Sequence, residues 1–247
     1  MATSGVDTFS LTRDTAITLA LRKLNVLELG VTPDSTTLTQ ANQNLNIMLK
    51  AWQTDGLKLW TVNELIIPYT AGKTVYTIGE SGADIINPRP LKVVYAFLRN
   101  NTTPTPIDIP MTIMAKTDYL MLGGKFSQGV TNTIFYDPLI PNGSLSVYLT
   151  PDTATVTNYT LHLIYQRQIQ DMVSSTDNFD LPQEWSQAIV WCLAAELCEE
   201  YDVPESKIQR ITMRADKYKN DLIDWDVEHA STFFQPDYRA QYQKGIQ

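Results

Sequence analysis

The chain has 247 residues, of which 43% are hydrophobic and 19% charged, as expected for one large or two small globular domains. A formal net charge of −8 argues against a general nucleic-acid-binding protein, although an acidic wall would let a duplex slide past it. The apolar runs are shorter than the ~20 residues that span a bilayer, and Met1–Ser10 has neither a basic nor an apolar region. We therefore expect no membrane partner and no secretory signal.

Two amphipathic helices are predicted at the start of the chain. The first runs from about Leu11 to Leu27, with Ser10 as its N-cap and Gly30 after its end. The second runs from about Leu38 to Thr54, with Gly56 placed to terminate it.

From Leu57 the apolar pattern becomes that of short strands separated by turn residues. The expected strands lie at 59–62, 65–67, 75–78, 91–98, 107–109, 133–136, 144–149 and 159–165. A helical turn is expected within 112–121, followed by a loop at 123–129. This series predicts an antiparallel β-sandwich or barrel-like domain.

Two further helices are predicted at Leu181–Tyr201 and Pro204–His229. The second carries an apolar stripe at heptad spacing, formed by Ile208, Ile211, Ala215, Tyr218, Leu222 and Trp225. This stripe packs either on the chain's own helices or on a neighbouring subunit. Solvated helix faces, or the lining of a DNA channel, are expected for the acids Glu199, Glu200, Asp221, Asp224, Asp226 and Glu228.

The fold class is therefore α+β, with an α-helical bundle formed by the N- and C-terminal helix pairs and a β domain inserted between them. The expected boundaries are 1–60 and 174–230 for the two halves of the helical body, 61–173 for the β domain and 231–247 for a C-terminal extension.

No catalytic residue, metal ligand or cofactor is predicted. Cys192 and Cys198 lie six apart on one predicted helix, so we expect two buried, reduced thiols. The acids Asp177, Asp180 and Glu184 fit the start of a helix better than an acid/base pair or a cation cage. The stretch at 123–125 lacks the full spacing of a phosphate-binding loop.

The extension is aromatic and polar, although it lies beyond every predicted core helix. Exposed aromatic clusters usually mark interfaces, so we favour partner contact over folding back onto the chain's own helices. The residues predicted to contact a partner are Phe233, Phe234, Pro236, Tyr238, Arg239, Tyr242 and Trp225.

The run from Leu45 to Trp60, LNIMLKAWQTDGLKLW, resembles the second-helix region of the head-to-tail adaptor, or tail accessory, proteins of short-tailed phages. The run from Leu181 to Trp185, leading through 194–197 to Tyr201 and Pro204, resembles the same family. The middle region, with its turns at 88–90 and 142–144, also fits. The similarity covers residues 9–228.

This resemblance implies a structural virion protein at the head–tail junction, assembled in the host cytoplasm. Such proteins form a ring with copies of themselves, typically of twelve subunits, under the portal protein. The ring extends the channel for passing double-stranded DNA, retains the packaged genome and seats the tail tube or tail hub. By similarity, Phe233–Tyr242 is the extension that reaches the portal.

Two alternatives remain open from the sequence. The β domain, which at roughly 66–166 is larger than in the smallest family members, could bind a receptor or glycan. Its candidates for stacking on sugars, which fit equally well as strand core, are Tyr76, Tyr95 and Tyr148. Some relatives are credited with cell-wall hydrolysis, but this sequence shows no acid/base arrangement that supports it.

Overall fold

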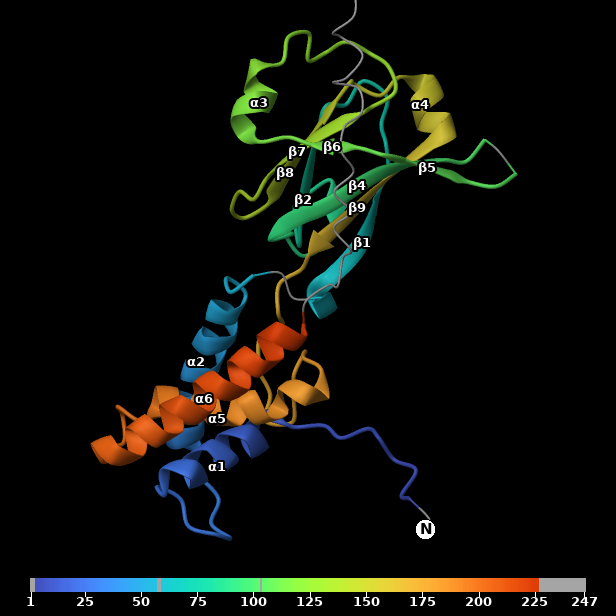
Figure 1. Cartoon of the computed structure of the whole chain (residues 1–247). Helices are drawn as coiled ribbons and strands as arrows, with labels where there is room; N and C mark the ends of the chain where they lie inside the picture. The colour runs from blue at the N-terminus through green and yellow to red at the C-terminus, as the bar shows by residue number, and fades with distance from the viewer. Residues whose placement is uncertain (1–2, 57–58, 103, 227–247) are drawn as a thin grey trace, which may run out of the picture.

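The computed structural model describes residues 3–56, 59–102 and 104–226. Within these residues it contains six α-helices and nine strands in two sheets, which confirms the predicted mixture of helices and strands. The four long helices lie together at one end of an elongated molecule, and the two sheets lie at the other (Figure 1).

The four long helices are α1 (Arg13–Leu24), α2 (Ser35–Trp52), α5 (Ser186–Leu197) and α6 (Glu205–Trp225). All four occur where the sequence predicted helices, but several ends differ. Helix α1 begins after the N-cap Thr12 and not after Ser10, and it ends at Leu24 and not at Leu27, because Asn25 adopts the left-handed conformation with φ 60°. Helix α2 begins earlier than predicted because the side chain of Asp34 accepts a hydrogen bond from the backbone N–H of Thr37. The third predicted helix is divided into a 3₁₀ turn at Gln183–Trp185 and the shorter α5.

Helix α5 is the centre of the helical part. Eight of its twelve residues are buried, and it contacts α1, α2 and α6. A helix that is apolar around most of its circumference is stable only when other elements enclose it. Trp185, beside its first turn, lies 5.5 Å from Trp52 and 4.8 Å from Trp60, measured between ring centroids. Segments from both ends of the described chain therefore close one apolar core.

The first sheet has the strand order β1-β9-β4-β5, and the second has the order β3-β2-β8-β7-β6. The first sheet contains β1 (Val62–Ile67), β9 (Tyr159–Gln166), β4 (Lys92–Asn100) and β5 (Ile107–Pro110). The second contains β3 (Ile85–Ile86), β2 (Val75–Gly79), β8 (Gly143–Tyr148), β7 (Thr133–Asp137) and β6 (Thr112–Ile113). Residues of both sheets share a second apolar core. The assignment of the two cores to separate domains, at the boundaries given above, stays a prediction.

Some features of the sheets differ from the sequence-based expectation. The pairs β2–β3 and β6–β7 are parallel, whereas the remaining pairs are antiparallel. The first expected strand is instead a 3₁₀ turn at Leu59–Thr61 that leads into β1. Two short helices, α3 (Lys116–Met121) and α4 (Thr153–Asn158), accompany the sheets. Helix α4 was not predicted, and Asp152 caps its first turn by accepting from the backbone N–H of Thr155.

Candidate interaction surfaces

A row of polar side chains on α2 binds the segment that leads from β9 to α5. The row is Asn42, Asn46, Lys50 and Gln53, whose spacing of four, four and three places them on one helix face. Asn46 donates from Nδ2 to the carbonyl of Met172 at 3.0 Å and accepts from its N–H at 2.9 Å. We call these four residues the α2 polar row. The segment they bind is the only covalent link from β9 to the C-terminal helices, so the row helps to set how the sheets lie relative to the helices.

The rest of the α2 polar row acts in the same way. Lys50 donates from Nζ to the carbonyl of Ile169 at 2.6 Å, and the Ile169 N–H donates to Oε1 of Gln53 at 3.0 Å. Asn42 donates to the Met172 carbonyl at 3.2 Å. This row was not predicted from the sequence. The helix-face spacing of its four polar residues is the one signal that could have indicated it, and that spacing does not say which backbone segment the row binds.

The acids before α5 have separate roles in the structure. Asp180 forms a two-pronged ion pair with the guanidinium of Arg167, at the end of β9. Asp177 accepts hydrogen bonds from the N–H groups of Ser174 and Val173, which lower the pKa of its carboxyl group. The side chain of Glu184 is exposed. Neither Asp177 nor Asp180 caps a helix, so the helix-start interpretation was wrong for these two acids.

The described residues hold no group of three or more His, Cys, Asp and Glu side chains able to bind a metal ion. Cys192 and Cys198 are both free and buried, as predicted from their spacing. Burial raises the pKa of the Cys192 thiol to about 12 and also raises the pKa of Cys198. Both thiols act as small apolar residues of the helical core.

One exposed apolar surface surrounds α3, at the end of the molecule farthest from the helices (Figure 1). Leu120, Met121 and Phe126 are 62%, 85% and 82% exposed there. Tyr119 of the same helix is buried and stacks on Phe135 of β7, with ring centroids 5.4 Å apart. This contact holds α3 on the sheet and leaves its other side chains available to a partner. We call Leu120, Met121 and Phe126 the α3 tip.

A second exposed apolar surface lies at the opposite end of the molecule, on the connection between α1 and α2 (Figure 1). It consists of Val26, Leu29 and Val31, with Leu29 the most exposed at 88%. We call these residues the α1–α2 tip. Apolar side chains gathered on a protruding segment usually mark a contact site.

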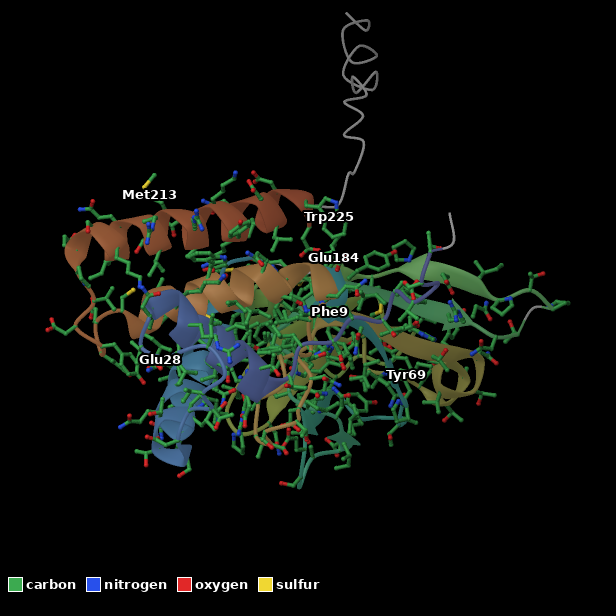
Figure 2. All side chains as sticks on the ribbon, turned by 90° about the horizontal axis from the view of Figure 1, so that it is seen from below. Phe9, Glu28, Tyr69, Glu184, Met213 and Trp225 are labelled. Atoms are coloured by element: carbon green, nitrogen blue, oxygen red, sulfur yellow. The ribbon has the colours of Figure 1, made fainter. Side chains whose placement is uncertain are left out.

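The end of α6 presents the one predicted contact residue that the structure describes. Trp225 lies at the C-terminal end of α6 and is 67% exposed (Figure 2). Asp226 accepts a hydrogen bond from the N–H of Leu59 at 3.3 Å, so α6 ends beside the start of β1. The other six predicted contact residues, Phe233, Phe234, Pro236, Tyr238, Arg239 and Tyr242, lie outside the described residues.

The apolar stripe of α6 packs within the chain. Ile211 and Ala215 are buried against α5, and Ile208, Tyr218 and Leu222 pack at the edge of the same core. Of the six stripe residues, Trp225 alone is exposed. The intramolecular interpretation is therefore correct for the inner face of α6, and the outer face is left for other contacts.

The aromatic residues considered for sugar stacking do not form a common platform. Tyr76 is buried in the sheet core, and its hydroxyl group accepts from the N–H of Thr70, so this candidate was wrong. Tyr148 is half-buried on β8, whereas Tyr95 is exposed on β4 in the other sheet.

Along the described part of the chain, none of the helices combines the length and apolar character that crossing a bilayer requires.

Comparison with known protein families gives a match over most of the chain. A family model described as SU10 adaptor protein matches residues 11–236. The matched region includes both helix pairs and both sheets. No curated protein matches the sequence.

Proposed function

The chain belongs to the SU10 adaptor protein family, which makes it a structural adaptor protein of a phage virion, and we propose that it forms the connector ring between head and tail. In this proposal the subunit docks under the portal protein and extends the DNA channel. It also retains the packaged genome and seats the tail tube or tail hub.

The observation that carries the proposal is the placement of exposed apolar side chains at opposite ends of an elongated subunit. The α3 tip lies at the sheet end, and the α1–α2 tip lies at the helical end (Figure 1). A protein that joins two partners needs a contact surface toward each of them, and protruding apolar residues supply such surfaces.

We assign the helical end to the portal and the sheet end to the tail. The family resemblance supports this assignment, because it implies that the helical body docks on the portal and that the C-terminal extension, here 231–247, reaches the same partner. Double-stranded DNA passes through the ring without sequence-specific binding, because acidic side chains repel phosphate groups. The role is mechanical and needs no catalytic residue or cofactor.

The test is native mass spectrometry of the full chain, alone and mixed with its cognate portal protein. We expect a discrete complex with one adaptor copy per portal subunit. A stable, folded chain that does not bind the portal would contradict the proposal and favour the alternative, recognition of a receptor or glycan by the sheets. In that case a glycan array would be the next measurement.

Two variants locate the portal contact. Removal of residues 231–247 should weaken portal binding by at least about tenfold, because the predicted aromatic anchors are lost. Trp225→Ala should weaken it less, since one anchor is removed. Met213→Ala is the matched control, because Met213 is another exposed apolar residue on the same helix, 72% exposed. Equal portal binding by all three variants would indicate that the portal contact lies on another surface.

A further inference from the structure

Helix α6 carries a line of basic side chains along one flank. Lys207, Arg210, Arg214 and Lys217 are spaced three, four and three residues apart, so they lie on one side of the helix. Arg214 lies over the ring of Trp191 at 4.9 Å, and Lys23 of α1 lies over the same ring at 5.0 Å. Together these five residues form what we call the basic flank. The basic flank lies on the side of α6 that is next to α1.

The basic flank is available for contacts. Among the described residues no ion pair is formed by any of its five members. Arg210, Arg214, Lys217 and Lys23 are all exposed. A line of unpaired cations is unexpected on a chain with a net charge of −8.

The other flank of α6 borders an acidic groove of about 360 Å³ between α5 and α6, beside Trp52 of α2. Glu196 and Glu199 of α5 and Asp216 of α6 line this groove. Its one basic residue, Lys219, is paired with Asp55 at 2.7 Å, so the three acids give the groove a net negative charge. The two flanks of α6 therefore carry opposite charges.

The charges within α6 favour the helix itself only in part. Glu205 in the first turn suits the helix dipole, whereas Lys207 in the same turn and Asp224 in the last turn oppose it. Lys217 precedes Asp221 by four residues, the less favourable order for an ion pair along a helix. Stabilisation of α6 therefore does not account for the basic flank.

We propose that the basic flank of one copy of this chain docks against the acidic groove of the next copy. The inference rests on the proposed ring, for which it names the contact between subunits. A closed ring is built from heterologous contacts, in which two different surfaces of each subunit meet. Complementary charges on opposite flanks of one outer helix supply such a pair of surfaces and fix the order of the subunits.

A second copy fits the basic flank better than DNA does. Complementary acids are present on the same chain, on the opposite flank of the same helix, so each copy offers both halves of the contact. A duplex would meet the negatively charged groove beside the basic flank, and its phosphate groups would be repelled there.

The experiment uses two charge-reversal variants of the full chain. One carries Arg210→Glu, Arg214→Glu and Lys217→Glu, which leaves two cations against three acids on the flank, so both of its faces are acidic. The other carries Glu196→Lys and Glu199→Lys, which leaves one acid against two cations in the groove, so both of its faces are basic. All five positions are exposed, so we expect both variants to fold, and this is checked by circular dichroism and thermal unfolding.

Assembly is measured by native mass spectrometry and analytical ultracentrifugation, with and without the portal protein. Each variant alone should assemble at least about tenfold more weakly than the wild type, because like charges meet at every contact. An equimolar mixture should restore assembly, because alternating copies again place opposite charges together. The control, Lys92→Glu with Lys116→Glu and Lys125→Glu in the sheet part, has the same change in net charge as the first variant and should assemble normally.

Several results would overturn the inference. Normal assembly by either variant alone, or a mixture that does not restore assembly, would show that these flanks do not meet. Reduced DNA binding by the Arg210→Glu, Arg214→Glu, Lys217→Glu variant with unchanged assembly would assign the basic flank to a polyanion. If the wild-type chain stayed monomeric with and without the portal, this would contradict both the proposed contact between copies and the proposed connector ring. Wild-type copies that associate through these flanks without binding the portal would remove only the proposed function.

Discussion

The helical part and the sheet part of this protein close their cores in different ways. The helical core is built from two segments, Leu11–Trp52 and Met172–Ala215, with the whole of both sheets between them. The sheet core comes from one continuous stretch, Ile67–Leu163. The helical part can close only after its two halves meet, so its closure carries the entropy cost of a long loop. The sheet part also closes a long loop, because β1 pairs with β9, but that loop is made of the sheet part's own chain.

The connection between the two parts differs from both cores because it is mainly polar. The α2 polar row and the Arg167–Asp180 ion pair hold the segment from β9 to α5. Hydrogen bonds have stricter geometry than apolar packing, so they favour one orientation of the sheets over many. A connector subunit with a contact at each end benefits from such a fixed orientation.

Core truncation gives the largest expected effect and tests whether the two parts unfold separately. Leu193→Ala in α5 should lower the free energy of unfolding of the helical part by about 2–5 kcal/mol. All five tryptophans lie outside residues 62–166, so tryptophan fluorescence follows the helical part.

The matched variant is Leu163→Ala in β9, because both leucines are fully buried. We expect it to shift the unfolding of the sheets, followed by circular dichroism, and to leave the tryptophan-detected midpoint unchanged. If each variant shifted both the tryptophan fluorescence and the circular dichroism transitions, the two parts would unfold as one cooperative unit. The helical and sheet parts would then not differ in stability.

Truncation within the α2 polar row should have the next largest effect. Asn46→Ala removes two hydrogen bonds to Met172, and we expect a loss of about 1–3 kcal/mol because the Met172 N–H loses its partner and the carbonyl keeps only Asn42. Hydrogen exchange at residues 169–173 should accelerate. Asn44→Ala is the control, since Asn44 bonds only to the exposed Glu200. Equal exchange in both variants would contradict the assigned role of the row.

The Arg167–Asp180 pair should contribute somewhat less. Asp180→Asn should lower stability by about 1–2 kcal/mol, because both side chains are roughly four-fifths buried but still reach solvent. Urea unfolding at low and high salt measures this difference, which should shrink as salt screens the charges. Glu184→Gln serves as the control, because Glu184 is exposed. A loss of the same size in the control would mean that net charge, and not the pair, sets the effect.

The α3 tip should show the smallest effect on stability. Met121→Ser should change the free energy of unfolding by no more than about 0.5 kcal/mol, because its side chain is 85% exposed. Tyr119→Ala on the same helix should cost about 2–4 kcal/mol, since it removes the stack on Phe135. Thermal unfolding of both variants measures the contrast. A large loss in the Met121 variant would place this residue in the fold and not in a contact surface.

The sequence by itself determined where the four long helices and most strands lie. Apolar residues at three-four spacing placed α1, α2, α5 and α6, and alternating runs with turn residues placed the longer strands. The spacing of Cys192 and Cys198 also excluded a disulfide between them. These features follow from which side of a local segment avoids water, and each segment carries that information within itself.

Only the tertiary structure determined which distant residues of the chain contact one another. It placed Asn46 against Met172, 126 residues away, paired Asp180 with Arg167 and buried Tyr76 in the sheet core. It also placed α6 between α1 on its basic flank and the acidic groove on the other. The residues on these surfaces are spaced regularly in the sequence. What each surface meets depends on how distant segments pack, and local periodicity carries no record of that.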